Sequence, residues 1–317
     1  MKVMIVKFSY RPYLIIVLFM YVRSSAQDNF VDFQAGMCPN QAMNQDFFSR
    51  NRDWQLAKKV YESYRKNWIY SKKEKIPKLL HHIWLGSPLP KFCSSLRKTW
   101  FEHNPTWKFI LWTDNPDNFK YGCLVCSYES LHRVLYENQE QFIVFDVRSL
   151  NLINQEAYDI TDNYGERSDI IRYEVLFEFG GLYVDTDFEC LKSFNIFHHT
   201  CDFYAGLGYS KTQALLNGLM GCSSKNLILK ICIQDLVKKP QGVQSSIIGR
   251  TGPGLLTRSF RKAFYSEGYS GIAVGFPVTT FYPWPNWDRW HKTNEEIKAW
   301  IQPESYGIHY WHVSWKN

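Results

Sequence analysis

The chain has 317 residues, of which 45% are hydrophobic and 21% charged, a globular composition that excludes a disordered or fibrous chain. Its net charge of +7 is modest and spread along the chain, so it suits an anionic small molecule such as a nucleotide and does not indicate nucleic-acid binding. Aromatic residues make up 17%, which leaves two interpretations open: a large aromatic core, or exposed rings that bind sugars.

The N-terminus has the pattern of an export signal. Lys2, Lys7 and Arg11 precede an apolar run at 14–22, and small residues follow it where a signal peptidase would cut. The run is shorter than the roughly 20 apolar residues of a membrane span, so a cleaved signal peptide at residues 1–26 is favoured over a signal anchor. We therefore expect an exported or membrane-associated protein, with a signal anchor as the route to membrane association.

Residues 27–75 are expected to form a helical preface to the main domain. Apolar residues recur at every fourth position, on what would be one face of a helix between about 44 and 70: Leu56, Val60, Tyr64 and Trp68. A lysine-rich turn then ends at Pro77. The preface is expected to pack on the domain that follows.

The main domain, residues 76–317, begins with alternating strand and helix patterns. Strands are expected at 79–86 and 107–112 with a helix at 91–103 between them, and another strand at 142–145. This alternation predicts an α/β fold with a mostly parallel sheet flanked by helices. A Gly-x-Gly-x-x-Gly loop is absent from the sequence, which argues against a dinucleotide oxidoreductase.

The second half of the chain is less regular. Helices are expected at 227–237 and near 255–264. The segment 281–287 is rich in proline, and we expect it to be a surface loop.

A short stretch in the middle of the chain carries the clearest chemistry. Helical residues from Ser168 lead to Gly180-Gly181, then to an uncharged strand at 182–184, and the carboxylates Asp185 and Asp187 follow directly. Ligands of open α/β sheets bind at the carboxyl ends of strands, and two carboxylates there suit a hard divalent cation that bridges phosphates. The bland alternative for Asp-x-Asp is a turn with local side-chain hydrogen bonds.

Asp169 and Arg172 are three residues apart and would share one face of that helix. Two interpretations are open for them. They form an ion pair, as many helical pairs of this spacing do, or they clamp ribose or sugar hydroxyls with the fixed fork of guanidinium donors.

Asp169-x-x-Arg172, followed by Gly180-Gly181-Leu182-Tyr183-Val184-Asp185-Thr186-Asp187, resembles the signature of DXD-containing sugar transferases. The similarity is to the family of yeast α-1,6-mannosyltransferases and mannosyl inositol-phosphoceramide synthase catalytic subunits, and more distantly to clostridial glucosylating toxins. Further matching segments follow the family's order along the chain: 76–86, 111–114, 251–253 and 309–315.

The resemblance implies a GT-A-like fold and a metal-dependent, retaining transfer of a hexose. The donor would be a nucleotide sugar, GDP-mannose or a UDP-hexose, with mannose as the favoured sugar, and the acceptor a glycan, lipid or protein. The metal would be Mn²⁺, with Mg²⁺ as the alternative, acting as a Lewis acid on the departing nucleotide diphosphate. Other hypotheses are a glucosyl- or galactosyltransferase effector acting on a protein, and an inactive sugar- or nucleotide-binding module.

The resemblance also assigns roles to single residues. Asp185 and Asp187 are the catalytic pair, with Asp187 as direct metal ligand and Asp185 reaching the metal through water or binding the ribose. His309 or His312 would complete the metal shell, unless both histidines are structural. The implied donor-binding residues are Trp84 near the base, unless it is a core residue, with Asp169, Arg172, Tyr183, Asp185, and Ser314 and Trp315 closing over the diphosphate.

Haloacid-dehalogenase-like phosphatases also use Asp-x-Asp after a strand. They place the motif near the start of the domain and follow it with Thr or Val two residues later. Here Phe188-Glu189 follows, and more than a hundred residues precede the motif. The position of the motif therefore disfavours this class.

Overall fold

The computed structural model describes residues 30–37, 51–118, 133–135, 140–209, 214–237, 246–290 and 292–312. The strands are β1 Leu79–Trp84, β2 Lys108–Thr113, β3 Phe142–Asp146, β4 Gly181–Val184, β5 Phe188–Cys190, β6 Phe203–Leu207, β7 Leu215–Cys222, β8 Ala273–Phe276 and β9 Gly307–His309. The helices are α2 Phe33–Met37, α4 Arg52–Asn67, α5 Lys91–His103, α7 Gln155–Ile160, α8 Tyr164–Phe179, α9 Asn195–Thr200, α10 Leu227–Val237, α11 Ile247–Arg250, α12 Pro253–Tyr265, α13 Val278–Phe281 and α14 Asn294–Lys298.

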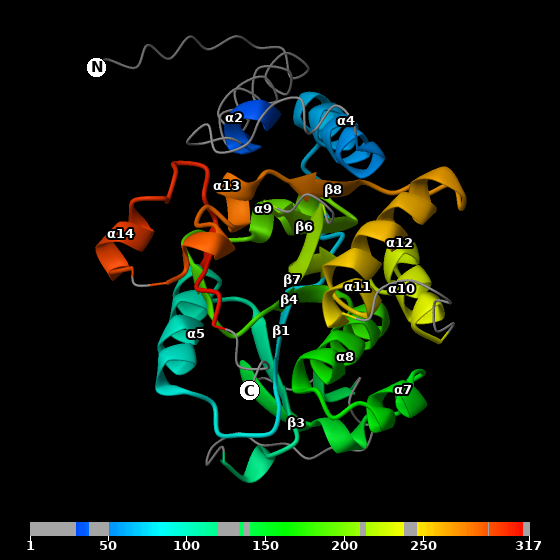
Figure 1. Cartoon of the computed structure of the whole chain (residues 1–317), viewed down its shortest axis with the longest axis vertical. Helices are drawn as coiled ribbons and strands as arrows, with labels where there is room; N and C mark the ends of the chain where they lie inside the picture. The colour runs from blue at the N-terminus through cyan, green and yellow to red at the C-terminus, as the bar shows by residue number, and fades with distance from the viewer. Residues whose placement is uncertain are drawn as a thin grey trace, which may run out of the picture.

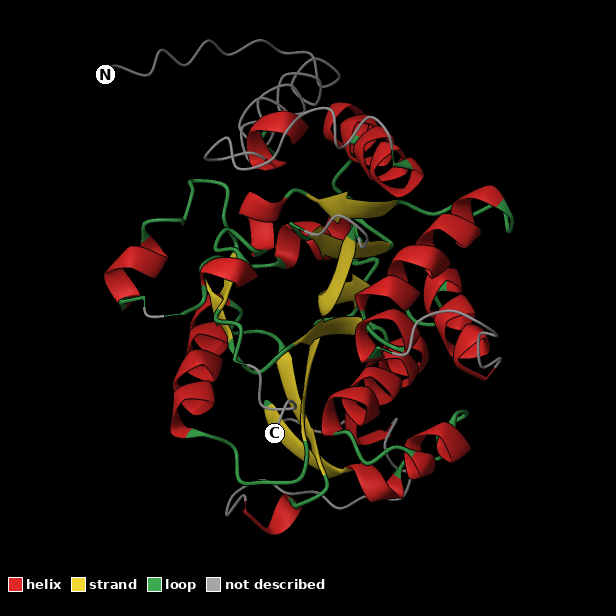
Figure 2. Cartoon of the chain, viewed as in Figure 1, coloured by secondary structure: helices red, strands yellow, loops and turns green. Residues whose placement is uncertain are grey.

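Seven strands form the central sheet in the order β3-β2-β1-β4-β7-β6-β8 (Figures 1 and 2). The four strands β3, β2, β1 and β4 are parallel; β7 is antiparallel to both β4 and β6, and β8 is parallel to β6. The expected α/β fold class, a mostly parallel sheet flanked by helices, is confirmed. The chain moves outward from β1 to β3 and then returns to the other side of β1 as β4. The point between β1 and β4, where this direction switches, is where open α/β sheets bind ligands.

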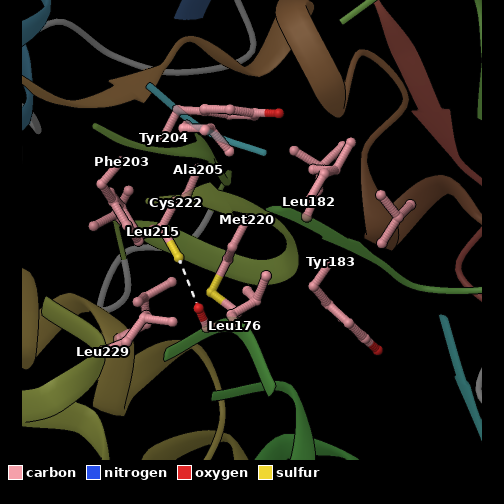
Figure 3. Close-up of a cluster of buried hydrophobic side chains, with 14 of the residues drawn as sticks. Leu176, Leu182, Tyr183, Phe203, Tyr204, Ala205, Leu215, Met220, Cys222 and Leu229 are labelled. Carbon is pink, nitrogen blue, oxygen red and sulfur yellow. Dashed lines mark hydrogen bonds between the residues drawn. The ribbon is translucent and has the colours of Figure 1, made fainter. Parts of the chain in front are cut away.

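Helices cover the strands from both sides. Figure 1 shows α5 on one side, and α8, α10 and α12 on the other. Figure 3 shows the core between them, where side chains of β4, β6 and β7 meet Leu176 of α8 and Leu229 of α10. The thiol of Cys222 on β7 donates to the backbone oxygen of Leu176 over 3.5 Å. Helix α8 is buried on most sides, as its apolar sequence predicts.

The passage from α8 into β4 depends on a cap at each end of the helix. The side chain of Asn163 accepts from the backbone N–H of Glu166, which starts the helix four residues before Ser168. Gly180 and Gly181 end it with φ angles of 66° and 104°. A Cβ at Gly181 would stand 2.5 Å from the backbone oxygen of Leu79, so glycine lets β4 approach β1.

Two consecutive histidines of β1 hold the two ends of β4. Trp112 donates its indole N–H to His81 Nδ1 (3.1 Å), so the other ring nitrogen of His81 carries the proton and donates to the oxygen of Gly180 (2.9 Å). His82 donates from Nδ1 to the oxygen of Val184 over 2.8 Å. The strand that leads to Asp185 is thereby fixed by side-chain contacts in addition to its pairing with β1.

Helix α4 packs on the far edge of the sheet, beside β8 (Figure 1). Tyr61 and Tyr64 of α4 meet the ring of Phe276 edge-on, with centroids 5.8 and 5.5 Å apart. The domain boundary at residue 76 stays a prediction, and the expected signal at 1–26 lies outside the described residues. Within the part of the chain that the structure describes, no helix combines the length and apolar character needed to cross a membrane.

The expectation of a surface loop at 281–287 is wrong for its first five residues. Positions 281–285 are buried, with Tyr282 and Trp284 only 1% and 2% exposed. Burying backbone without a partner is costly, but Pro283 and Pro285 have no N–H to satisfy. This backbone can therefore enter the interior, and the neighbouring side chains of Phe281, Tyr282 and Trp284 fill it.

The buried histidines predict a loss of stability in mild acid. Burial lowers the pKa of His81 to about 4 and that of His198 to about 3, whereas an unfolded histidine has a pKa near 6.5. Below about pH 6.5 these histidines bind protons in the unfolded chain but stay neutral in the folded protein, so the free energy of unfolding falls as pH falls towards 4. Each histidine should account for about 2 kcal/mol between pH 7.5 and pH 5.

Urea unfolding at pH 7.5, 6.5, 5.5 and 5 measures this dependence. His198→Gln and His81→Gln should each be less stable at pH 7.5 but lose less stability on acidification. His103→Gln, at the exposed end of α5, is the matched control and should keep the slope of the unmodified protein. An equal slope in all four proteins would contradict the prediction.

Candidate metal and nucleotide-sugar site

The candidate site is built around Asp185 and Asp187, which directly follow β4 at the switch point of the sheet. The backbone N–H of Asp185 donates to the oxygen of Gly218 on β7 over 2.8 Å, so the ladder between β4 and β7 continues one residue past the strand. Tyr183 donates its hydroxyl to Asp185 Oδ1 over 2.7 Å. Asp187 is 5% exposed, which makes it one of the buried charges of the protein.

A second, small sheet brings His309 to these carboxylates. Strand β5 follows the motif and pairs antiparallel with β9, placing Phe188 opposite His309. His309 Nε2 lies 2.8 Å from Asp187 Oδ1 and 3.7 Å from Asp185 Oδ2. Its Nδ1 has no hydrogen-bond partner among the described residues, so the ring is held by its Nε2 contact and by the rings of Phe188 and Trp311, with centroids 4.6 and 4.2 Å away.

Arg172 joins the other side of Asp185 to α8. Its Nη1 lies 3.3 Å from Asp185 Oδ1, and its Nη2 lies 3.2 Å from Asp169 Oδ1. The guanidinium also lies over the ring of Tyr183, 4.3 Å from its centroid. Charged groups thus alternate in sign along the site in the order Asp169, Arg172, Asp185, His309, Asp187.

Asp169 is surrounded by protein donors. Besides Arg172, the side chains of Asn217 and Thr251 each donate to one of its carboxylate oxygens over 2.8 Å. Asp169 is 6% exposed, so these contacts replace water. The arrangement makes it a residue that positions Arg172. Sequence patterns missed Asn217, a single polar residue in a strand, and identified Thr251 only as part of a glycine-proline turn.

Burial and neighbouring charge make the two acids of the motif unequal. Burial raises the pKa of Asp185 above its usual range, although Arg172 and His309 act to lower it. Burial acts in the same direction on Asp187, but the nearby His309 and the backbone N–H of His312 outweigh it, so the pKa of Asp187 is lowered. Burial alone would lower the pKa of His309, yet Asp187 and Asp185 raise it.

Three of these side chains are arranged to hold a metal ion. One ligand atom from each of Asp185, Asp187 and His309 lies within 4.8 Å of the other two. Carboxylate oxygens suit hard divalent cations, and an imidazole nitrogen is also accepted by transition metals such as Mn²⁺. The three carboxylates of the site outnumber its two positively charged groups, Arg172 and His309, and this excess negative charge favours binding of a divalent cation. The proton on His309 Nε2 points toward the carboxylates, where the ion would bind. Metal binding would therefore release this proton.

The other predicted site residues lie around this cluster or outside the described residues. Trp84 ends β1 at the switch point, half-buried, and its indole N–H donates to the oxygen of Ser87 over 2.8 Å. The backbone N–H of His312 donates to Asp187 Oδ2 over 2.7 Å, while its exposed imidazole lies beside the ring of Phe92. Ser314 and Trp315 lie outside the described residues.

Comparisons with known families agree with this geometry. Residues 90–203 match the family described as "Glycosyltransferase sugar-binding region containing DXD motif", and residues 222–317 match "Alpha 1,4-glycosyltransferase conserved region". The resemblance to DXD-containing glycosyltransferases is confirmed. The first match contains the motif itself, and the second contains His309 and the strand that carries it.

The chain is similar to two kinds of curated relative. Lactosylceramide 4-alpha-galactosyltransferase of Rattus norvegicus is 33% identical over 153 residues, 45% of this chain and 40% of the relative. Inositol phosphoceramide mannosyltransferase 3 of Schizosaccharomyces pombe is 22% identical over 226 residues, 69% of this chain and 55% of the relative. The chain thus spans about half the length of the curated relatives it matches. Among solved structures, PaToxG Glycosyltransferase is similar with 18% identity and a TM-score of 0.48, covering 68% of this chain and 81% of that one.

The geometry predicts that metal binding depends on a glycine opposite the motif. A Cβ at Gly218 would stand 2.5 Å from Asp185 Oδ2, so in Gly218→Ala the carboxylate must turn away. We expect Mn²⁺ affinity, measured by calorimetric titration, to fall about tenfold or more, as when a supporting residue of a metal site is lost. Gly307→Ala is the matched control, because a Cβ there meets its nearest atom at an ordinary 3.4 Å. Unchanged affinity in a folded Gly218→Ala protein would contradict the assigned role of Asp185.

Proposed function

We propose that the chain is a metal-dependent, retaining glycosyltransferase that moves a hexose from a nucleotide sugar to an acceptor hydroxyl. The observation that carries the proposal is the convergence of Asp185, Asp187 and His309 at the switch point of the sheet, where nucleotide ligands of α/β proteins bind. The family matches over both halves of the domain support the same activity.

In the proposed reaction the bond between C1 of the sugar and the diphosphate oxygen breaks. Its electron pair leaves with the nucleoside diphosphate, the acceptor oxygen bonds to C1, and the acceptor proton passes to the diphosphate or solvent. Asp187, His309 and Asp185 would hold a divalent cation, which would stabilise the charge on the leaving diphosphate. Retention of configuration is carried over from the family resemblance.

The chain's own residues prepare this site. Arg172 neutralises part of the charge on Asp185 and fixes its orientation, and Asp169 holds Arg172 in turn. Tyr183 supports Asp185 through its hydroxyl. Contact of Trp84, the last residue of β1, with the nucleotide base stays a prediction. Direct contact of Asp169 or Arg172 with the donor sugar, and closure by Ser314 and Trp315, stay predictions.

We infer the classes of donor and acceptor from the names of the relatives. One group of relatives is named for galactose transfer and the other for mannose transfer, and both names include a ceramide acceptor. We infer a UDP-galactose or GDP-mannose donor and a glycan or glycolipid acceptor. Export or membrane association through residues 1–26, and Mn²⁺ as the metal, stay predictions on the same basis.

Turnover of nucleotide sugars tests the proposal. We expect the protein with Mn²⁺ to release nucleoside diphosphate from UDP-galactose or GDP-mannose, slowly to water and faster to an acceptor. Chelation with EDTA should abolish the release, and Asp187→Asn should lower it about 100-fold, because the charge that holds the cation is removed.

Glu295→Gln, on the exposed face of α14, is the control that removes a carboxylate elsewhere and should keep full activity. Turnover of neither donor would contradict the proposal, as would turnover that Asp187→Asn leaves intact. Donor binding by calorimetry without any turnover would instead indicate an inactive nucleotide-sugar-binding module.

A further inference from the structure

A cavity of about 170 Å³ lies beside β7, near the candidate metal site formed by Asp185, Asp187 and His309. Gly208 and Tyr209 after β6, Leu216 of β7, Tyr282, Asn286 and Trp311 line it. Its walls are thus three aromatic rings, a leucine and one amide, without a charged side chain among the lining residues. Drug-sized ligands occupy pockets of roughly 300–1,000 Å³, so this cavity matches one sugar ring and is too small for a nucleotide.

Two aromatic residues that line the cavity, Tyr282 and Trp311, also contact the candidate metal site. The ring of Trp311 meets His309 edge-on, with centroids 4.2 Å apart, and Tyr282 meets the same histidine at 5.7 Å. Tyr282 also reaches the carboxylate side of the site. Its hydroxyl and Asp185 Oδ2 both lie within 3.2 Å of the point where a Cβ at Gly218 would stand. A molecule in the cavity would therefore lie against two residues that contact the candidate metal ligands.

The hydroxyl of Tyr282 is a polar group in need of a partner. Tyr282 is 1% exposed, and although its oxygen lies near the backbone of Leu219, it makes no hydrogen bond of good geometry to any described residue. Leaving a buried hydroxyl unpaired costs about 1–3 kcal/mol. A ligand with hydroxyl groups would satisfy it, whereas a hydrocarbon would not.

Trp311, whose ring packs against that of Tyr282 with centroids 5.6 Å apart, has a strained backbone conformation. Its φ angle is 55°, in the left-handed region that non-glycine residues seldom adopt, and strain of this kind is concentrated at ligand sites. Its indole N–H donates to the oxygen of the buried Trp284 over 2.9 Å, which fixes the plane of the ring. The ring is therefore a rigid aromatic wall of the kind that pairs with the apolar face of a sugar.

An exposed aromatic residue lies next to one lining residue of the cavity. Trp287 is 52% exposed, and its ring meets Tyr209, a wall of the cavity, edge-on at 4.8 Å. A sugar held inside could thus extend through neighbouring residues of a glycan across Trp287. None of the described residues that line the cavity is charged, which favours a neutral sugar over a phosphorylated one.

We propose that this cavity is the acceptor subsite, which binds the terminal hexose of a neutral glycan or glycolipid. Trp311 and Tyr209 provide its stacking walls, and the hydroxyl of Tyr282 donates to a hydroxyl of the sugar. The identity of the sugar as an acceptor rests on the proposed transferase function. The binding of a neutral sugar rests on the cavity alone.

Sugar binding is measured first, without a donor, by saturation-transfer NMR on the full chain. The probes are lactose and the methyl glycosides of galactose, glucose and mannose. At least one should bind, and its affinity should fall tenfold or more in Trp311→Ala and about tenfold in Tyr282→Phe, which removes a single hydrogen bond and keeps the ring. Tyr265→Phe, exposed at the end of α12, is the matched control and should bind like the unmodified protein.

Transfer rates are measured next, with the donor that the protein turns over and the sugar that it binds. Tyr282→Phe should raise KM for the acceptor about tenfold and leave KM for the donor unchanged, a split that a general structural defect would not produce.

Two results would contradict the assignment of this cavity as the acceptor subsite. The first is that none of the four sugars binds; the second is that neither variant changes the sugar affinity or the KM for the acceptor. Failure of the protein to release nucleoside diphosphate from any donor contradicts the transferase proposal instead. The NMR result then still decides whether the cavity binds sugar.

Discussion

Two neighbouring carboxylates repel each other, and the contacts around the half-buried Asp185 and the buried Asp187 offset that repulsion. Arg172 lies against one acid and His309 against the other, while Asp169 anchors Arg172 from behind. The three carboxylates still outnumber Arg172 and His309, so the site keeps a net negative charge. A divalent cation is the natural counter-charge, and two oxygens and a nitrogen converge where it would bind.

Strand pairing makes this electrostatic arrangement rigid. The histidines of β1 hold both ends of β4, the β4–β7 ladder fixes the backbone of Asp185, and the β5–β9 pair carries His309 across to Asp187. The same β7 and C-terminal segments also wall the aromatic cavity. The metal cluster and the proposed acceptor subsite are therefore two sides of one framework, so that a donor on the cation and an acceptor in the cavity would meet near Asp185.

Sequence patterns predicted those features of the fold and the site that are determined by a few neighbouring residues. Alternating strand and helix patterns, the Gly180-Gly181 stop and the acids after β4 are all encoded within a few residues, and the structure contains each of them. Partners from distant segments carried no such signal: Asn217 on Asp169 and Tyr282 near Asp185 are single residues whose position depends on the fold. Proline content also misled, because segment 281–285 is irregular but buried.

The direct test of the central claim is anomalous diffraction from crystals grown with Mn²⁺ and UDP or GDP. We expect a manganese peak bonded to Asp187 and His309, in contact with Asp185 directly or through water, with the diphosphate of the nucleotide on the same ion. A manganese peak elsewhere, or a nucleotide bound away from the ends of β1 and β4, would contradict that expectation.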